Sequence, residues 1–337
     1  MTSLVVQTSF LGDMVLTTPC LHELASRGPV DVVATPAAAA LLVNNPDVRR
    51  VIVYDKRGAD RGLRGFRRVA RAMRESRAEI AYLAQGSLRS AALAMAAGIP
   101  SRVGFSTSSG RALYTRAIPY RRDLHHAARL LQLADPARVP DVARLRPRLY
   151  PGEPERAAVA ALLDAAGVTA GETLVALAPG SVWATKRWPE YPALAHALQD
   201  AARIVVIGSR ADVALASAIA DAAGPRTVNA TGALSLLASA ELIGRCRVLV
   251  TNDSAPQHLA SAMGTPTLTI FGPTVPEFGF GPLAPHSIVV QRDGLPCRPC
   301  DPHGPPACPL KHWNCMRELA PGDVAARVRH LLEVTSP

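Results

Sequence analysis

The length of 337 residues predicts about two folded domains, and a composition of 48% hydrophobic and 19% charged residues excludes a disordered chain. The net charge of +10 predicts an anionic partner, while the aromatic content of only 4% argues against a nucleic-acid surface on which bases stack. No apolar run approaches the roughly 20 residues of a membrane span, and the start of the chain lacks the features of a secretory signal, so we expect a protein of the reducing cytoplasm.

Short apolar strands alternate with helical segments in the first half of the chain. Uninterrupted apolar strands are typical of a parallel sheet buried on both faces, and their alternation with helices predicts a doubly wound α/β fold. The expected strands are Leu4–Gln7, Val30–Ala34, Val51–Tyr54 and Ile80–Ala84, and the expected helices are Met14–Ser26, Leu63–Ser76 and Ser87–Ala97.

A stretch rich in Pro and Arg, Val139–Pro154, is the best candidate for a linker, and a second series of elements follows it. Its expected strands are Thr173–Ala178, Ile204–Ile207, Val248–Thr251 and Thr267–Phe271, and its expected helices are Glu155–Gly167, Pro189–Asp200, Ala211–Ala223, Pro256–Met263 and the terminal Pro321–Val334. We therefore predict two Rossmann-like domains, residues 1–150 and 151–337.

The loop after the first strand carries Ser9, Gly12 and Asp13 and leads into a helix that we expect to start at Asp13. In a parallel sheet, loops at the carboxyl ends of strands face the ligand crevice. Asp13 is therefore either a general base at that crevice or an ordinary helix N-cap.

The corresponding loop of the second half is rich in groups that bind anions. Gly180 permits a close approach of the backbone, and Pro189 is suited to the first position of a helix. Hydroxyls, cations and a helix N-terminus together predict a diphosphate site, with an ordinary exposed loop as the alternative. The side chains concerned are Ser181, Thr185, Lys186 and Arg187, and Lys186 is one of only three lysines in the chain.

Two further strand ends complete this set. The first, Thr251–Ala260, places Asp253 and Ser254 before a helix that contains Pro256 and His258. These residues could simply cap the helix, with His258 on its surface, or the free N–H groups could hold a phosphate or a sugar. The second, Phe271–Pro276, is expected to line the same pocket. The usual P-loop and dinucleotide fingerprints are absent from the sequence.

Four cysteines cluster near the C-terminus. Their spacing resembles a closed four-thiolate zinc or iron–sulfur site, although it is not the usual pair of CxxC knuckles. Reduced, unligated thiols are the alternative. The four residues are Cys297, Cys300, Cys308 and Cys315.

Taken together, these motifs resemble the lipopolysaccharide heptosyltransferase family, glycosyltransferase family 9, and within it the ADP-heptose:lipopolysaccharide heptosyltransferase II branch. The resemblance covers most of the chain. It rests on the segments FLGDMV (10–15), PGS…KRWP (179–189), TNDS with His258 (251–258) and FGPT (271–274). Ala255-Pro256 departs from the Gly-containing pattern that is common in the family.

The resemblance implies a GT-B architecture with the active site in the cleft between the two domains. The N-terminal domain would hold a lipid A–core oligosaccharide acceptor at the inner-membrane surface, with Ser9 and Gly12 in the acceptor-side loop. The C-terminal domain would hold ADP-heptose through the loop that carries Lys186 and the segment that carries Asp253.

The implied reaction is an inverting transfer of heptose to the inner core, in which Asp13 is the base, Lys186 meets the charge of departing ADP, and no cofactor is required. Two alternatives stay open: a transferase of the same fold with another donor or acceptor, and a nucleotide-binding protein without catalysis.

Overall fold

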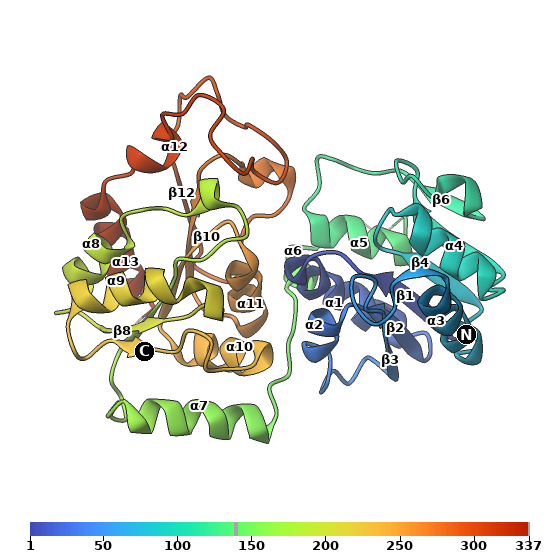
Figure 1. Ribbon diagram of the computed structural model, residues 1–337, viewed down its shortest axis with the longest axis horizontal. Helices are drawn as coiled ribbons and strands as arrows, with labels where there is room; N and C mark the ends of the chain where they lie inside the picture. The colour runs from blue at the N-terminus through green and yellow to red at the C-terminus, as the bar shows by residue number, and fades with distance from the viewer. Residues whose placement is uncertain (138–140, 336–337) are drawn as a thin grey trace. The chain divides into compact units, whose positions relative to one another are not determined.

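The computed structural model describes residues 1–137 and 141–335, and it divides into two compact units, Met1–Tyr150 and Pro151–Pro337. Each unit contains a six-stranded sheet whose paired strands are all parallel (Figure 1). The predicted α/β class, with two doubly wound Rossmann-like sheets, is therefore confirmed.

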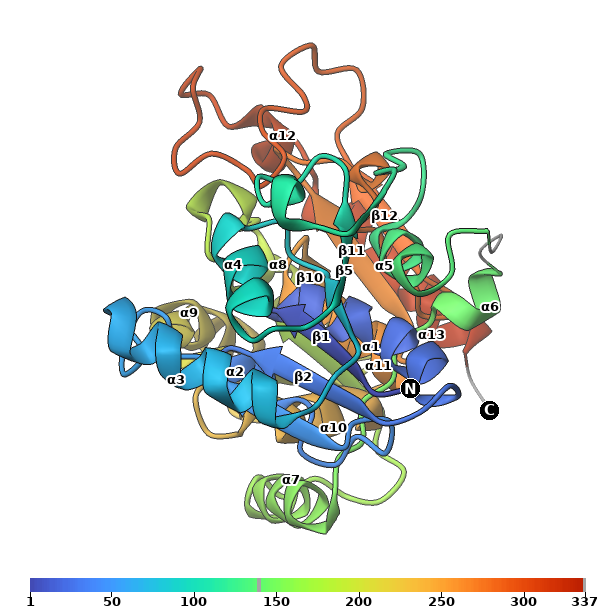
Figure 2. The same cartoon turned by 90° about the vertical axis from the view of Figure 1, so that its right-hand side faces the viewer.

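The strands of the first unit follow the order β3-β2-β1-β4-β5-β6. Helices α1 and α5 pack beside one another, as do α3 and α4 (Figure 2). The elements are β1 (Ser3–Gln7), α1 (Leu11–Ala25), β2 (Val30–Ala34), α2 (Pro36–Ala40), β3 (Arg50–Val53), α3 (Gly62–Glu75), β4 (Ile80–Leu83), α4 (Leu88–Ala96), β5 (Ser101–Phe105), η1 (Arg111–Leu113), β6 (Arg116–Ile118), α5 (His126–Ala134) and α6 (Val142–Leu145).

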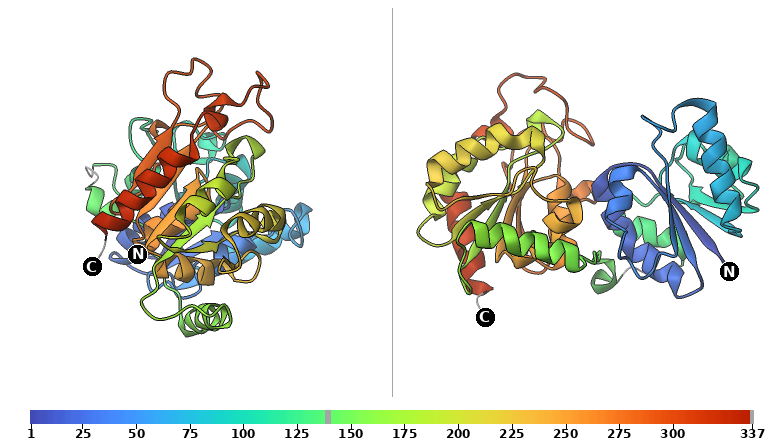
Figure 3. Two further views of the ribbon diagram at one scale, coloured as in Figure 1. Left: turned by 90° about the vertical axis from the view of Figure 1, so that its left-hand side faces the viewer. Right: turned by 60° about the horizontal axis from the view of Figure 1, so that its bottom comes forward.

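The second unit repeats this plan with the order β12-β11-β10-β7-β8-β9. Figure 3 shows this unit from two further sides, with helices packed against its sheet. Helix α8 packs beside α9 and α13, and α10 packs beside α7 and α11. The elements are α7 (Glu153–Ala165), β7 (Leu174–Ala178), η2 (Ala184–Lys186), α8 (Tyr191–Leu198), β8 (Arg203–Val206), η3 (Arg210–Asp212), α9 (Val213–Ala223), β9 (Val228–Asn229), α10 (Leu236–Arg245), β10 (Val248–Asn252), α11 (Ala255–Met263), β11 (Thr267–Phe271), η4 (Pro276–Phe278), β12 (Ile288–Gln291), α12 (Asn314–Arg317) and α13 (Pro321–Val334).

In both sheets the chain starts at a central strand, builds one side, and then crosses over to build the other. The crossover lies between β1 and β4 in the first unit and between β7 and β10 in the second. Ligands of open α/β sheets bind at the carboxyl ends of the strands at such a crossover. The chain segments that follow β1, β7 and β10 are therefore the places to look for a functional site.

Each sheet has a hydrophobic core of its own. One cluster of buried side chains packs β1, β2 and β4 against α3 and α4, and another packs the strands of the second sheet against α8, α9 and α13. Every residue of β1, β7 and β11 is buried, which explains why these strands lack alternating polar positions.

Helix α1 contains Pro19, which has no backbone N–H to offer the carbonyl of Val15 one turn earlier. The Thr18 hydroxyl donates a hydrogen bond to that carbonyl instead, over 2.8 Å. The same hydroxyl oxygen accepts the backbone N–H of Arg148 at 3.0 Å. The proline is thus accommodated without an orphaned carbonyl, and the end of the first unit is attached to the middle of α1.

Asp60 makes the stability of the first unit dependent on pH. Its buried carboxylate accepts hydrogen bonds from Arg68 Nε at 2.6 Å and from the Asp55 backbone N–H at 2.9 Å. The hydrogen bonds from Arg68 hold the pKa of Asp60 below its usual value. The resulting stabilisation is complete above the pKa of the unfolded chain, about 4, and is lost as the pH falls through the folded-state pKa.

We expect Asp60→Asn to lower the free energy of unfolding by about 1–2 kcal/mol at pH 7, because the charged hydrogen bonds from Arg68 are lost. The loss stays this small because the half-exposed Arg68 side chain can then form hydrogen bonds with water. The difference from the wild type should shrink at pH 3, measured by urea unfolding at both pH values. Asp123→Asn is the matched control, since Asp123 forms the same kind of ion pair with Arg121 but on the open surface. An equal loss at both pH values would contradict the assignment.

Candidate active site

Asp13 lies at the carboxyl end of β1, in the first turn of α1. The helix starts at Leu11 and not at Asp13, so Asp13 is its third residue, and Phe10 occupies the N-cap position. The Asp13 carboxylate accepts the Phe10 backbone N–H at 3.4 Å, in the manner of a capping box. Gly12 is buried within this first turn, so it belongs to the helix and not to the preceding loop.

A set of polar side chains surrounds the Asp13 carboxylate. The Ser9 hydroxyl lies 2.5 Å from Asp13 Oδ2 and 2.6 Å from Gln7 Oε1, and His126 Nε2 lies 3.7 Å from Asp13 Oδ1. The carboxylate side chain is 17% exposed, so it is partly enclosed and still open to solvent. Such a group can accept a proton from a hydroxyl placed beside it.

His126 is a part of this site that the sequence analysis missed. Burial lowers the pKa of His126, which favours the neutral imidazole. A neutral imidazole places no full positive charge beside the Asp13 carboxylate. The one feature of the sequence that could have indicated this residue is the pair His125-His126 at the start of an apolar helical segment. That segment forms α5 in the structure.

In the second unit the structure brings Lys186 and Asp253 together across the β7/β10 crossover. Lys186 Nζ lies 2.6 Å from Asp253 Oδ2, and both side chains are only 11% exposed. Residues 184–186 form a short 3-10 turn, and α8 starts at Tyr191, so Pro189 does not begin the helix as predicted and Lys186 lies in a separate turn before it. Its position depends on the carboxylate of the neighbouring strand end.

Asp253 is the centre of a small polar network. Its carboxylate also accepts hydrogen bonds from the Thr274 hydroxyl at 2.7 Å and from Gln257 Nε2 at 3.0 Å. Ser254 is the N-cap of α11, but its side chain makes no capping bond. The capping interpretation therefore does not describe either Asp253 or Ser254. His258 is buried within α11, so the alternative that places it on the surface of the helix is wrong.

Two of the other predicted anion-binding side chains, those of Thr185 and Arg187, donate hydrogen bonds to backbone carbonyls. The Arg187 guanidinium donates to the Ser181 carbonyl at 2.7 and 2.9 Å. The buried Thr185 hydroxyl donates to the Pro305 carbonyl. These bonds shape the loop, and of its two cations Lys186 is the one that contacts the β10 strand end.

Asn252 connects this loop to β10. It is fully buried, its amide donates to the Pro179 carbonyl at 2.8 Å, and its Oδ1 accepts the Trp188 backbone N–H at 3.1 Å. One side chain therefore holds both ends of the loop that carries Lys186. The sequence analysis included Asn252 in a motif without giving it this function.

Asn252→Ala is expected to leave one buried donor and one buried acceptor unsatisfied, at a cost of about 1–3 kcal/mol each. The midpoint of thermal unfolding should fall. Since the family resemblance implies that this loop holds ADP, the affinity for ADP should fall with it because the loop loses both anchors. Calorimetry and ADP titration measure the two effects, with Asn229→Ala as a control on an exposed asparagine. Unchanged ADP affinity in a folded Asn252→Ala protein would show that the loop holds no nucleotide.

The four clustered cysteines do not form the predicted metal site. In the described part of the chain, no three His, Cys, Asp or Glu side chains are arranged to hold a metal ion. Cys300 is exposed and donates its thiol to the Cys297 carbonyl, whereas Cys315 belongs to the core of the second unit. Burial raises the pKa of Cys315 to about 11.

Comparison with known proteins defines the class. Residues 66–310 match glycosyltransferase family 9 (heptosyltransferase), and the chain belongs to this family. It is 30% identical over 322 residues to lipopolysaccharide heptosyltransferase 1 of Pseudomonas aeruginosa, covering 88% of this chain and 85% of that protein. It is 27% identical over 294 residues to lipopolysaccharide heptosyltransferase 2 of Salmonella typhimurium, covering 82% and 84% of the two chains.

Solved structures agree in fold. A family 9 glycosyltransferase from Veillonella parvula aligns with a TM-score of 0.87 at 23% identity, over 98% of this chain and 97% of that one. The E. coli ADP-heptose lipopolysaccharide heptosyltransferase II aligns with a TM-score of 0.79 at 24% identity, over 99% of each chain. No helix of the described residues combines the length and apolar character needed to cross a membrane.

Proposed function

We propose that this glycosyltransferase moves a heptose from ADP-heptose to the inner core of lipopolysaccharide. The buried Lys186–Asp253 contact at the β7/β10 crossover carries the proposal, because it presents a cation where a doubly wound sheet binds its ligand. The names of the curated relatives support the choice of donor and acceptor. The curated relatives include heptosyltransferases numbered 1 and 2, so similarity alone does not choose between the two. The heptosyltransferase II branch is therefore part of the proposal.

The two units divide the reaction between them in this proposal. The unit Met1–Tyr150 takes the lipid A–core acceptor, with Ser9 and Asp13 beside the reacting hydroxyl. The unit Pro151–Pro337 takes ADP-heptose, with Lys186 at the diphosphate and the residues of α11 near the sugar.

The transfer is proposed to be a single displacement that inverts the anomeric carbon. The acceptor oxygen forms a bond to that carbon while its proton passes to Asp13, and the bond from the carbon to the diphosphate oxygen breaks. ADP leaves with the electron pair of that bond. Lys186 faces the negative charge that grows on the diphosphate, and a positioned cation stabilises such charge in a partly dry site. This scheme requires no divalent cation.

An acceptor on a lipid places the protein at the inner face of the membrane, and helix α3 supports this. Arg64, Arg67 and Arg71 are exposed on α3 at a spacing that places them along one side of the helix. None of the three forms an ion pair within the described residues. Basic helix faces of this kind are attracted to anionic lipid surfaces. We therefore propose a peripheral, cytoplasmic location.

A donor screen tests the function. The protein is incubated with ADP-heptose, ADP-glucose or UDP-glucose and a heptose-deficient core acceptor, and the products are weighed by mass spectrometry. We expect one added heptose with ADP-heptose alone. Preferred transfer of another sugar would identify a family 9 transferase of different specificity. Tight ADP binding without transfer from any donor would favour the non-catalytic alternative.

A further inference from the structure

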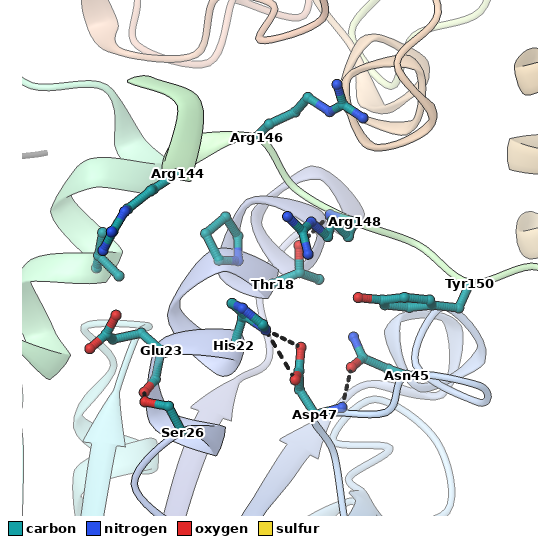
Figure 4. Close-up of a pocket in the computed structure, with 12 residues that line it drawn as sticks. Thr18, His22, Glu23, Ser26, Asn45, Asp47, Arg144, Arg146, Arg148 and Tyr150 are labelled. Carbon is teal, nitrogen blue, oxygen red and sulfur yellow. Dashed lines mark hydrogen bonds and ion pairs between the residues drawn. The ribbon is translucent and has the colours of Figure 1, made fainter. Parts of the chain in front are cut away.

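The first unit contains a cavity lined by several polar and charged side chains, which does not include Asp13. It measures about 390 Å³ and lies between the end of α1, the turn before β3 and the segment 144–150 (Figure 4). The helix residue His22 on its wall is nine residues beyond Asp13, or about 14 Å along the axis. The cavity is therefore at the opposite end of α1, near the amino ends of the strands.

The segment 144–150 supplies the cavity with positive charge. Along it, Leu145, Pro147 and Leu149 are buried, whereas the intervening arginines Arg144, Arg146 and Arg148 are exposed. All three arginines line the cavity. Within the described residues, their side chains form no hydrogen bond or ion pair. A hydrogen bond from the Arg148 backbone N–H to the Thr18 hydroxyl attaches the segment to α1 in this orientation.

The acidic side chains on the cavity wall do not neutralise these arginines. Asp47 lies 3.1 Å from His22 Nδ1, and Glu23 lies 2.7 Å from an Arg27 nitrogen. Among the described residues, neither carboxylate forms an ion pair with the arginines of the segment 144–150. The cavity keeps an excess of donors and of positive charge on the side formed by the segment 144–150.

Asn45 adds a buried donor that faces this side. The residue is 5% exposed, and its Oδ1 accepts the Asp47 backbone N–H at 2.9 Å. Its Nδ2 is buried and has no hydrogen-bond partner among the described residues. In Figure 4 the amide nitrogen points toward Tyr150 and Arg148. A buried donor without an acceptor costs free energy, and a bound anion would remove that cost.

We propose that this cavity binds a small phosphorylated sugar. Arg148 and Asn45 Nδ2 would donate to the phosphate oxygens, and guanidinium groups suit that geometry. Ser26, Glu23 and Asp47 on the remaining wall offer the oxygens that sugar hydroxyls need. The volume lies within the range of small-molecule pockets. The inference is independent of the proposed transfer reaction, because it uses none of the residues assigned to it.

Calorimetric titration of the full chain with glucose 6-phosphate, inorganic phosphate and glucose tests the proposal. We expect glucose 6-phosphate to bind, phosphate to bind more weakly and glucose not to bind. Arg148→Ala and Asn45→Asp should each weaken glucose 6-phosphate by about tenfold or more. Asn45→Asp keeps the acceptor for Asp47 and replaces the donor by a carboxylate oxygen. Arg327→Ala, which removes an exposed arginine of the second unit outside the cavity, should leave the affinity unchanged.

Two further experiments distinguish binding in this cavity from binding at another site or to another ligand. Saturating ADP should not displace glucose 6-phosphate, whereas displacement would place the sugar phosphate in the donor site and overturn the proposal. Phosphatidylcholine vesicles with and without phosphatidic acid test a lipid-borne phosphate. Vesicle binding that depends on Arg148 and Asn45, without a response to glucose 6-phosphate, would also overturn it. So would equal affinities in the wild type and both cavity variants, or no binding of any probe.

Discussion

Asp13→Asn is expected to reduce sugar transfer by roughly 100-fold or more while the protein stays folded. The amide cannot take the proton of the acceptor hydroxyl, and a positioned base contributes about 10²- to 10⁴-fold. Its Oδ1 can still accept the Phe10 backbone N–H and the Ser9 hydroxyl, which now lie at 3.4 and 2.5 Å. The measurement is the initial rate of transfer from ADP-heptose with the acceptor in excess.

Controls keep this result interpretable. The thermal midpoint and the affinity for ADP should match those of the wild type, because the proposed donor site lies in the other unit. Ser9→Ala removes the hydroxyl nearest the carboxylate and retains the carboxylate, so it should lower the rate much less than Asp13→Asn. A nearly normal rate in Asp13→Asn would reduce Asp13 to a capping residue of α1.

Lys186→Met is the second large expected effect. Loss of the cation should weaken ADP binding by roughly 10- to 100-fold, which corresponds to about 1.5–3 kcal/mol for a charge-assisted hydrogen bond. The Asp253 carboxylate would remain beside the incoming diphosphate and repel it. Calorimetric titration with ADP measures the affinity, and steady-state kinetics measure kcat/KM for ADP-heptose.

The double variant Lys186→Met/Asp253→Asn distinguishes a ligand contact from a structural ion pair. A buried carboxylate left without its cation destabilises the fold, and neutralising it should restore part of the unfolding free energy. ADP affinity should stay low, because the lysine is still missing. Recovery of ADP affinity together with stability would show that Lys186 serves only to neutralise Asp253.

The sequence predicted the fold where strands are uninterrupted apolar runs. Strands β2 and β11 and helix α13 have the predicted bounds, since burial on both faces or a proline at the helix start marks them clearly. Strand β5 was missed because SRVGF contains an arginine and a glycine, and its pattern does not differ from a loop. The start of α1 was placed two residues too late because Phe10 is an unusual N-cap.

The candidate site was harder to predict from the sequence, because it depends on contacts between residues that are far apart along the chain. Lys186 and Asp253 are 67 positions apart, and their contact follows from the pairing of β7 with β10, in which Ala178 lies opposite Thr251. Motif spacing marks both strand ends but does not say which strands are neighbours. His126 was missed for the same reason. The cysteine spacing was misleading, since closeness in sequence does not direct four thiols to one point.

The separate cores of the two sheets have an evolutionary consequence. Every residue of the first core lies before Tyr150 and every residue of the second lies after Pro151. A loop of the first unit can therefore lengthen, or change its side chains, without repacking the layers that hold Lys186 and Asp253. Selection can revise what one half recognises while the other half stays constant. A single ancestral plan of this kind can give rise to enzymes that share one activated sugar and place it on many different acceptors.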